Sequence, residues 1–288
     1  MRIAIVGANG VYGRHLVPRL VAAGHDVRAL VRRPEAAGAA LAYGADVRAA
    51  DIYDAASLRT ALAGCDVCVN LATAVPGGPS GRGSAAANDR LRREGVPVLI
   101  EACRQAGTGR LLQQGICWVG AAGEELADES HAFEGEEDAP GMAAIRAAQA
   151  MEDAVRGSRL DWAILRGGLF YGPGTGAEEG WFARAATGEL RLPGDGSDFA
   201  TFVHVADMAA ATAAAIAAWP SRQTLIVADD TPLRWRALFA HVAALAGAET
   251  PPEGDPVRFP SFRMSNRRAR EVLGWTPRYP DVRCGLAR

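Results

Sequence analysis

The chain begins with a repeating pattern of short apolar runs separated by segments of mixed polarity. An apolar run at 2–6 is followed by a glycine-rich turn and then by apolar residues spaced three or four positions apart over 11–23. A second apolar run occupies 26–31. Continuous apolar runs are typical of strands buried on both faces, whereas the wider spacing is typical of an amphipathic helix. The pattern therefore predicts a strand, a helix that ends near Gly24, and a second strand.

The same alternation continues along the rest of the chain. Strands are predicted at ADVRAAD, CDVCVNLA, GRLLQQGICWV, LDWAILRGG and TLIVA, and helices between them, as at DAASLRTALAG and PVLIEACRQAG. Strands that alternate with helices indicate a parallel sheet covered on both faces. The predicted fold class is α/β, a Rossmann-type doubly wound parallel sheet with a small C-terminal substrate lobe.

A change in composition divides the chain near residue 168, after which glycine, proline and tryptophan become more frequent. We expect a Rossmann dinucleotide-binding core over 1–167. Residues 168–288 should hold the remaining sheet elements and a small substrate-binding lobe, with 198–229 belonging to the core.

Two stretches, 74–89 and 123–141, show no clear periodicity and predict loops. Long loops after strands often form the walls of sites. The acidic character of the second stretch is equally consistent with simple solvation.

Composition narrows the function classes. The 288 residues include 22% charged residues and carry a formal net charge of -2, as in ordinary soluble globular proteins. Without a basic surplus we expect no nucleic-acid partner, and the longest apolar stretch, 208–219, is shorter than the ~20 residues that cross a bilayer, so we expect no membrane partner. The N-terminus shows no secretory signal, which favours a cytoplasmic location. The oligomeric state is left open.

The five cysteines are an odd number without the dense spacing of a disulfide framework, so we expect free thiols. Cys65 and Cys68 form a C-x-x-C pair within a predicted strand, where positions i and i+3 face opposite sides. No second pair completes a four-ligand set, and no metal site is predicted.

Glycines spaced G-x-x-G-x-x-G separate the first strand from the first helix. Glycine lets the backbone turn sharply and approach a pyrophosphate, and the helix N-terminus offers free N–H groups and partial positive charge. In this strand–turn–helix context the spacing predicts dinucleotide binding rather than a merely structural turn. The predicted contacts in the turn are Gly7, Asn9, Gly10, Val11, Tyr12 and Gly13.

The end of the second strand indicates which dinucleotide is bound. An NAD site places an acid there to bind the ribose 2′-hydroxyl, but this chain has Arg32 and Arg33. A guanidinium cannot accept that hydrogen bond, whereas it pairs well with a 2′-phosphate. The alternative is a solvated strand end. NADP(H) is the predicted cofactor.

Five segments, ADVRAADIYD, NLAT, ILRGGLFYGPG, FVHVADMAAA and LGWTPRYP, occur in an order that resembles the extended or atypical, epimerase-like branch of the short-chain dehydrogenase/reductase superfamily. The resemblance covers nearly the whole chain. It implies that Asp51 and Ile52 lie beside the adenine, that the backbone of Leu71 and Ala72 follows the adenine ribose, and that Gly168 and Leu169 lie under the nicotinamide.

In that superfamily a Ser or Thr, a Tyr, and a Lys four residues later perform the chemistry. The resemblance places Gly115–Cys117, Met142 and Arg146 at these positions. All 31 basic residues of this chain are arginine, so Arg146 indicates little, and its guanidinium can still reach the nicotinamide ribose. Met142 has no proton to give, so tyrosine acid catalysis is excluded at this position.

Other side chains could supply a proton in its place. The candidates are Cys117, Tyr171, Ser130 and His204, although a structural role is the ordinary expectation for each, and His204 suits a satisfied strand residue. We predict no general acid among them.

A reductase without a protein acid needs a substrate that lowers its own barrier. A ketone on a polycyclic aromatic, polyketide-like substrate does so when a neighbouring phenol stabilises the developing oxyanion, and the chain resembles the atypical ketoreductases of angucycline antibiotic pathways. Two alternatives remain: an NADP(H)-binding regulator or pseudoenzyme, and a non-redox cyclase or lyase on the same scaffold. The predicted substrate walls, for which core packing is the alternative, are Trp118, Met142, Phe170, Tyr171 and Trp181.

Overall fold

The structure is a computed structural model that describes residues 1–75 and 83–286. Contacts between residues divide the chain into two compact units, each assembled from three segments. Unit 1 comprises Met1–Gly115, Arg146–Leu165 and Ala209–Leu225, and unit 2 comprises Ile116–Ile145, Arg166–Met208 and Ile226–Arg288. Each unit therefore combines segments from both sides of residue 168, and of the segment 198–229 that we assigned to the core, Ala209–Leu225 lies in unit 1.

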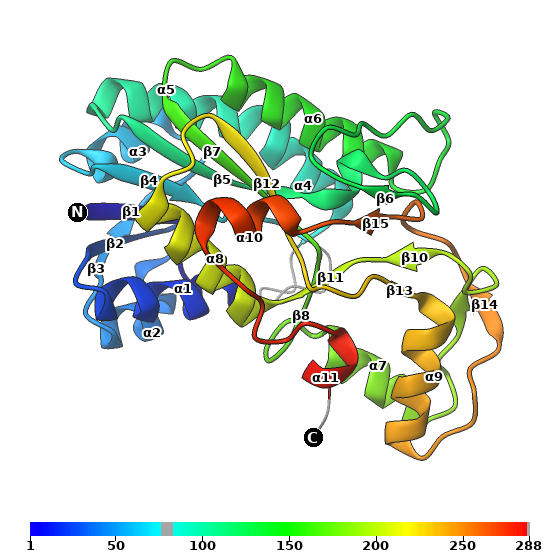
Figure 1. The fold of residues 1–288 in the computed structure, drawn as a ribbon. Coiled ribbons are helices and arrows are strands. Elements are labelled where there is room, and N and C mark those ends of the chain that lie inside the picture. Colours follow the sequence, from blue (N-terminus) through cyan, green and yellow to red (C-terminus); the bar gives the residue numbers. More distant parts are fainter. Residues whose placement is uncertain (76–82, 287–288) are drawn as a thin grey trace. The chain divides into compact units, whose positions relative to one another are not determined.

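A seven-stranded parallel sheet forms the centre of unit 1 and confirms the predicted α/β class (Figure 1). The order is β12-β7-β5-β4-β1-β2-β3, so the chain reverses direction across the sheet after β3, as in a doubly wound fold. The strands are β1 (Arg2–Val6), β2 (Asp26–Val31), β3 (Asp46–Ala49), β4 (Val67–Asn70), β5 (Arg110–Ile116), β7 (Asp161–Gly167) and β12 (Gln223–Val227).

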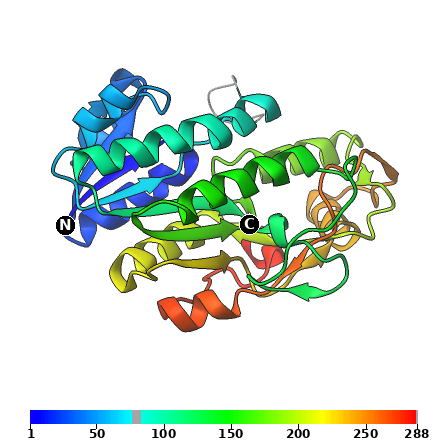
Figure 2. The same ribbon diagram turned by 90° about the horizontal axis from the view of Figure 1, so that it is seen from above.

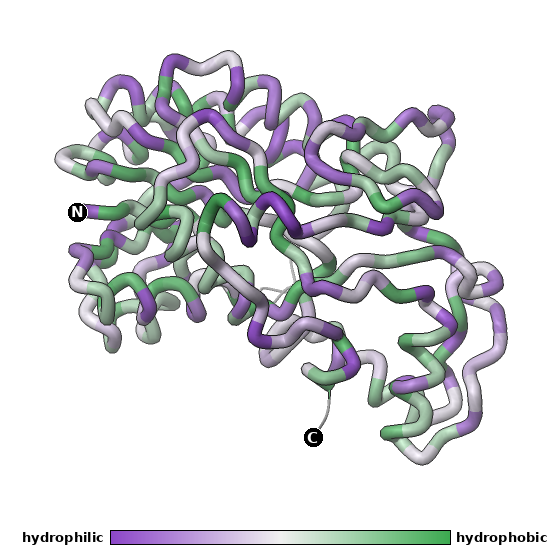
Figure 3. Tube along the Cα trace, in the orientation of Figure 1, coloured by the Kyte–Doolittle hydropathy of each residue, from purple (hydrophilic) through white to green (hydrophobic). Residues whose placement is uncertain are grey.

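Helices cover both faces of this sheet. On one face, buried side chains of α3, α5 and α6 pack against the strands, including Leu58, Leu99 and Met151. On the other, α1 and α8 are joined by a hydrogen bond between the Tyr12 and Thr212 hydroxyls. In Figure 3 the central strands are green along most of their length, in keeping with the fully buried side chains of Ile3, Ala4 and Ile5 in β1. The helical segments are α1 (Val11–Ala22), a 3-10 turn (Pro34–Ala36), α2 (Gly38–Ala42), α3 (Ala55–Leu62), α4 (Ala85–Arg90), a π-helical turn (Leu91–Gly95), α5 (Val96–Ala106), α6 (Met142–Arg156) and α8 (Val205–Ala218).

Unit 2 is built from two-stranded pairings and short helices around an aromatic core. Phe202 and Phe262 are fully buried there, and Trp181 and Trp235 lie edge-on to Phe202. The paired strands are β8 (Leu169–Tyr171) with β11 (Phe202–His204), β9 (Leu192–Pro193) with β14 (Glu253–Asp255), β10 (Phe199–Ala200) with β13 (Leu233–Arg234), and β6 (Leu126–Ala127) with β15 (Arg263–Met264). The helices are a 3-10 turn (Cys117–Gly120), α7 (Ala177–Ala186), α9 (Trp235–Ala246), α10 (Arg267–Leu273) and α11 (Val282–Gly285). Figure 2 shows the same elements from above.

The structure corrects both predicted loops in part. Within 74–89, residues 76–82 lie outside the described part of the chain, but Ala85–Arg90 form α4, where the Ser84 hydroxyl accepts the Ala87 N–H at 3.0 Å. Alanine favours helix without giving an apolar period, which is why the pattern missed α4. Within 123–141, Leu126–Ala127 form β6, which is too short to show an alternation.

Among the helices that the structure describes, none has the length and apolar character to cross a bilayer.

Candidate functional site

The glycine turn after β1 has the geometry that close approach of a ligand requires. Gly7 has φ +83°, and an added Cβ would lie 2.9 Å from the Ala72 nitrogen. A Cβ on Gly13 would lie 2.2 Å from the Ala8 carbonyl oxygen, so this glycine lets α1 pack directly on the turn. A Cβ on Gly10 would meet only the Gly7 oxygen, at 3.2 Å, among the described residues. Gly7 and Gly13 thus serve the local fold, whereas Gly10 borders open space.

Helix α1 offers an anion site at this turn. Gly10 is its N-cap and has no side chain. The first intrahelical hydrogen bond is the one that the Arg14 N–H donates to the Gly10 oxygen, at 3.0 Å. The N–H groups of Val11–Gly13 therefore have no partner within the helix. Free N–H groups and the helix dipole favour a pyrophosphate, so the turn fits a dinucleotide. Asn9 and Val11 are half-buried beside it, whereas the Tyr12 side chain is buried against Thr212, which leaves its backbone alone for a ligand.

The predicted cofactor residues that follow β2, β3 and β4 lie along the same edge of the sheet. Parallel pairing sets Val6 opposite Leu30 and Asn70, so the carboxyl ends of β1, β2 and β4 are level. Arg32 and Arg33 follow β2, are exposed, and form no salt bridge with the residues that the structure describes. Both guanidinium groups are thus available to a phosphate at this edge.

Asp51 and Ile52 follow β3, and Leu71 and Ala72 follow β4. The Asp51 carboxylate accepts the Tyr53 N–H at 3.0 Å, and the Ile52 side chain is buried. The Leu71 N–H donates to the Val6 oxygen at 3.0 Å, and Ala72 donates to the Asn70 side chain at 3.2 Å. These bonds fix the backbone that the resemblance places along the adenine and its ribose.

Met142 and Arg146 lie on α6, four residues apart and hence on one face of the helix. Met142 is the first residue of α6 and is half-buried, and its N–H donates to the Ala139 oxygen at 3.0 Å. Arg146 is exposed. The helix therefore presents a thioether and a guanidinium one turn apart.

The segment at the predicted serine position offers no usable hydroxyl or thiol. Cys117 is fully buried, and this burial raises the pKa of its thiol far above the usual range. The Trp118 ring packs against Phe259 and Phe262, with centroids 5.2 and 5.8 Å away. Neither Gly115 nor Ile116 carries a polar side chain, so Gly115–Cys117 supply packing and backbone.

The other candidate acids are held in structural roles. Tyr171 is fully buried, and burial raises the pKa of its phenol well above the usual range. The Ser130 hydroxyl donates to the Asp128 carboxylate at 2.6 Å. Nδ1 of His204 accepts the Ala206 N–H at 3.1 Å, and its ring stacks on Tyr279.

Among the remaining predicted residues, the structure explains one glycine and packs one predicted aromatic wall residue against the core of unit 2. A Cβ on Gly168 would lie 2.8 Å from the Phe202 carbonyl carbon, and Leu169 donates its N–H to the Thr201 oxygen at 2.9 Å. Trp181 packs against Phe202 and Phe239, so its ring belongs to the core of unit 2. Phe170 is half-buried.

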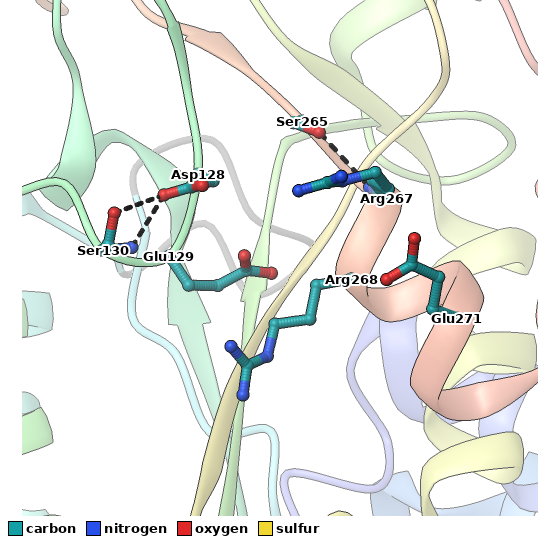
Figure 4. Close-up of a pocket in the computed structure, with 7 residues that line it drawn as sticks. All are labelled: Asp128, Glu129, Ser130, Ser265, Arg267, Arg268 and Glu271. Carbon is teal, nitrogen blue, oxygen red and sulfur yellow. Dashed lines mark hydrogen bonds between the residues drawn. The ribbon is translucent and has the colours of Figure 1, made fainter.

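A crevice in unit 2, between the β6 loop and α10, contains charges of both signs (Figure 4). Glu129 faces Arg268 across it, and the Glu129 carboxylate accepts the Ile226 N–H at 2.8 Å. Burial raises the pKa of Glu129. Acidic and basic side chains are nearly balanced here, so the crevice does not select a charged ligand.

Sequence comparison decides the family. Residues 7–218 match the profile of the NAD(P)H-binding family. The chain belongs to the NAD(P)H-binding family. The matched residues include the glycine turn and the strand ends level with it, and the family does not distinguish NADP(H) from NAD(H).

Two relatives carry names of reductases. The chain is 38% identical to the 3-diazoavenalumate denitrifying reductase of a Streptomyces species, over 100% of both chains. It is also 35% identical over 133 residues to the 4-hydroxy-2-methyl-3-oxo-4-farnesyl-3,4-dihydroquinoline-1-oxide ketoreductase of Stigmatella aurantiaca, which covers 46% of this chain and 39% of that one.

Solved structures share the fold. MoeE5, in complex with UDP-glucuronic acid and NAD, has a TM-score of 0.78 at 23% identity, and the UDP-glucose 4-epimerase of Thermus thermophilus, in complex with NAD, has a TM-score of 0.79 at 22% identity. Each match covers 99% of this chain and 96% of the other. At this identity the likeness concerns the fold alone.

Sequence reasoning missed two features of this NAD(P)H-binding protein. Inside the sheet, the Asn70 side chain donates to the Gln113 side chain at 2.9 Å, which orients the amide that holds Ala72. In unit 2, Asp229 is buried with a raised pKa of about 8 and lies two residues after β12. A carboxylate near the carboxyl end of a strand was the available signal for Asp229.

Proposed function

We propose that this protein is an NADPH-dependent reductase that reduces an aromatic substrate without an acid from the protein. The observation that carries the proposal is Met142 at the start of α6, one turn before Arg146, where the resemblance places Tyr and Lys. The buried thiol of Cys117 and the buried phenol of Tyr171 do not replace the missing group.

The residues of unit 1 would hold the cofactor, and each has a separate task. The N–H groups of Val11–Gly13 would bind the pyrophosphate, and Arg32 and Arg33 the 2′-phosphate. Arg146 would donate to the nicotinamide ribose. When bound, the nicotinamide supplies a hydride.

A diazo-substituted arene is the substrate class we favour. When a hydride adds to an arenediazonium ion, a C–H bond forms, the C–N bond breaks, and its electron pair leaves with N₂. The charges balance without any proton, so a site with a methionine in place of tyrosine suffices. The full-length relative that is named a denitrifying reductase supports this choice.

A ketone on a polycyclic aromatic substrate is the second candidate, supported by the relative named a ketoreductase. The alkoxide formed from such a ketone needs a proton, which a neighbouring phenol of the substrate would provide. A positioned acid contributes about 100- to 10,000-fold in rate, so the substrate must replace a large effect. The resemblance to angucycline enzymes such as the simocyclinone ketoreductase stays a prediction within this candidate.

The test is the rate of NADPH oxidation, followed by loss of absorbance near 340 nm, with three substrates and purified protein. The substrates are a hydroxyarene diazo compound, a polycyclic ketone next to a phenol, and the methyl ether of that ketone. We expect turnover of the diazo compound, and at least a ~100-fold lower kcat/KM for the methyl ether than for its parent. Gly10→Val, which should not bind cofactor, controls for direct reaction of NADPH with the diazo compound.

Tight NADPH binding without turnover of any substrate would contradict the proposal and favour a regulator or pseudoenzyme. Equal rates for the ketone and its methyl ether would mean that the protein holds an acid, and Cys117, Tyr171 and Ser130 would be the first to replace.

A further inference from the structure

An exposed tyrosine lies on the loop after β3, beside the residues that the resemblance places next to the adenine. Tyr53 directly follows Asp51 and Ile52 and is 40% exposed. Its N–H donates to the Asp51 carboxylate at 3.0 Å, and the Asp51 N–H donates to the Ser57 hydroxyl at 3.2 Å. The Tyr53 hydroxyl forms no hydrogen bond with the residues that the structure describes. A fixed backbone therefore presents a phenol that is available to a ligand.

Arg90, at the end of α4, holds the ring of this tyrosine. Its guanidinium carbon lies 4.9 Å from the centroid of the Tyr53 ring, within the distance of a cation–π contact. The Arg90 Nε donates to the Glu94 carboxylate at 2.7 Å, which fixes the orientation of the guanidinium. Arg90 thus has its charge paired with Glu94 and its guanidinium over the ring of Tyr53.

The π-helical turn Leu91–Gly95 explains how α4 reaches the loop after β3. Such turns insert an extra residue into a helix and are frequent at functional sites. A Cβ on Gly95 would lie 3.1 Å from the Ile52 side chain, so this glycine lets the turn pack closely on the residue before Tyr53. The packing places the end of α4, and with it Arg90, against the loop that carries the phenol. All of these residues belong to unit 1.

Arg32 comes to the same corner of the sheet from β2. Parallel pairing sets Val31 opposite Ala49, so β2 and β3 end level, and Arg32 leaves the sheet beside the loop of Tyr53. Burial raises the pKa of the Tyr53 phenol, and the positive charges of Arg90 and Arg32 oppose this rise without cancelling it. The phenol therefore keeps its proton at neutral pH and can donate a hydrogen bond beside Arg32.

The charged groups around the phenol differ in whether they have partners. Glu94 is paired with Arg90, and the Asp51 carboxylate accepts the N–H of Tyr53 itself. Arg32 is exposed and forms no salt bridge within the described chain. An anion at this corner would thus meet one unpaired guanidinium and one neutral donor.

We propose that the Tyr53 hydroxyl donates a hydrogen bond to the 2′-phosphate of NADPH that Arg32 would bind, and that Arg90 positions the tyrosine ring for this contact. The inference rests on the proposed function in one respect, the choice of NADPH. It extends that proposal by adding a neutral donor and a positioning residue that help to select the cofactor. NADH has a hydroxyl in place of the phosphate and would gain less, because hydrogen bonds to a charged group are the stronger ones.

Calorimetric titrations of the full chain with NADPH and with NADH test the role of the hydroxyl. Tyr53→Phe keeps the ring and removes only the hydroxyl, so it should weaken NADPH binding about 3- to 10-fold and leave NADH binding nearly unchanged. The matched control is Tyr43→Phe, which removes the hydroxyl of another exposed tyrosine of unit 1, the C-cap of α2. This control should leave the affinity for both cofactors unchanged.

Two substitutions of Arg90 test its positioning role by the same ratio of affinities. Arg90→Gln removes the cation over the ring and should lower the preference for NADPH to about the level of Tyr53→Phe. The double variant should lose no more than either single variant, because the ring and the guanidinium act through one contact. Arg90→Lys keeps a cation beside the ring and should retain most of the preference.

Losses that add up in the double variant would give Arg90 its own contact with the phosphate and overturn its positioning role. A preference for NADPH that survives Tyr53→Phe but not Arg32→Ala would overturn the role of Tyr53 and leave the proposed cofactor standing. Equal affinities of the wild type for NADPH and NADH would overturn both. Because these titrations involve no substrate, a failure to reduce any substrate would contradict the reductase alone.

Discussion

Met142 is the residue on which the chemistry of this protein depends most. If it is a wall of the site and not a catalyst, Met142→Ala should raise KM more than it lowers kcat for the true substrate. Met142→Tyr restores a phenol, but the Gly115–Cys117 segment offers no hydroxyl to orient it, so the gain in kcat should stay far below ~100-fold. Steady-state kinetics with NADPH measure both. A fall in kcat of the alanine variant at unchanged KM would give Met142 a direct part in the reaction.

Arg32 tests the choice of cofactor at the same scale. Its exposed guanidinium has no salt bridge within the described chain, so we expect NADPH to bind at least ~10-fold more tightly than NADH, about 1.4 kcal/mol. Arg32→Ala should narrow this preference and leave the NADH affinity nearly unchanged. Calorimetric titrations measure it, with the exposed Arg59→Ala as control. An equal loss of affinity for NADPH and NADH would mean that Arg32 supports the folded structure and does not bind the 2′-phosphate.

The buried carboxyl of Asp229 should make the stability of the folded protein depend on pH. Burial raises its pKa from 3.8 to about 8 in the folded protein, so between these values the folded state holds a proton that the unfolded state has released. The stability that the neutral carboxyl contributes is complete below pH 3.8 and is lost progressively as pH rises from there to about 8. Asp229→Asn retains an oxygen to accept the Thr231 N–H and cannot ionise.

Melting temperatures at pH 5 and pH 8 test this linkage. We expect the wild type to lose several degrees more than Asp229→Asn over this interval. Equal losses would show that the Asp229 carboxyl ionises in the folded protein as it does in water.

At the scale of elements, the turn between β1 and α1 separates folding from binding. Gly13→Ala places a Cβ 2.2 Å from the Ala8 oxygen and should cost about 1–3 kcal/mol, a fall of several degrees in Tm. Gly10→Val should retain the Tm but abolish cofactor binding, because its side chain enters the space for the pyrophosphate. Differential scanning fluorimetry and titration with NADPH measure the two effects. A wild-type affinity in Gly10→Val would mean that the dinucleotide binds elsewhere.

Elements were predictable where the local pattern is strong. The run at 2–6 is β1, the spaced apolar residues after the turn form α1, and the later runs include β4, β5, β7 and β12. Helix α4 has no apolar period, and β6 is two residues long, so neither leaves a local signal. Pairing of β6 with β15 depends on a partner far along the chain, which periodicity does not register.

At the scale of the whole molecule, a common edge for the predicted cofactor residues could be expected from sequence, because each group of them comes directly after a strand of one parallel sheet. The burial of individual side chains could not be predicted from the sequence, because it depends on contacts between distant segments. Tyr171 was a candidate acid and wall, yet Gly285 covers its hydroxyl from more than a hundred positions along the chain. A pocket lined by Glu178 of α7 and Gly285 of α11 likewise joins two elements that no local pattern connects.

The central claim is that hydride is transferred without a proton from the protein, and the pH dependence of kcat/KM tests it most directly. The measurement uses NADPH and a hydroxyarene diazo compound between roughly pH 5.5 and 7.5, where an ordinary His would titrate and where Cys117 and Tyr171, with their raised pKa values, would not. The account predicts a flat profile across this range. A titration limb that shifts or disappears when Cys117, Tyr171, Ser130 or His204 is replaced would contradict it.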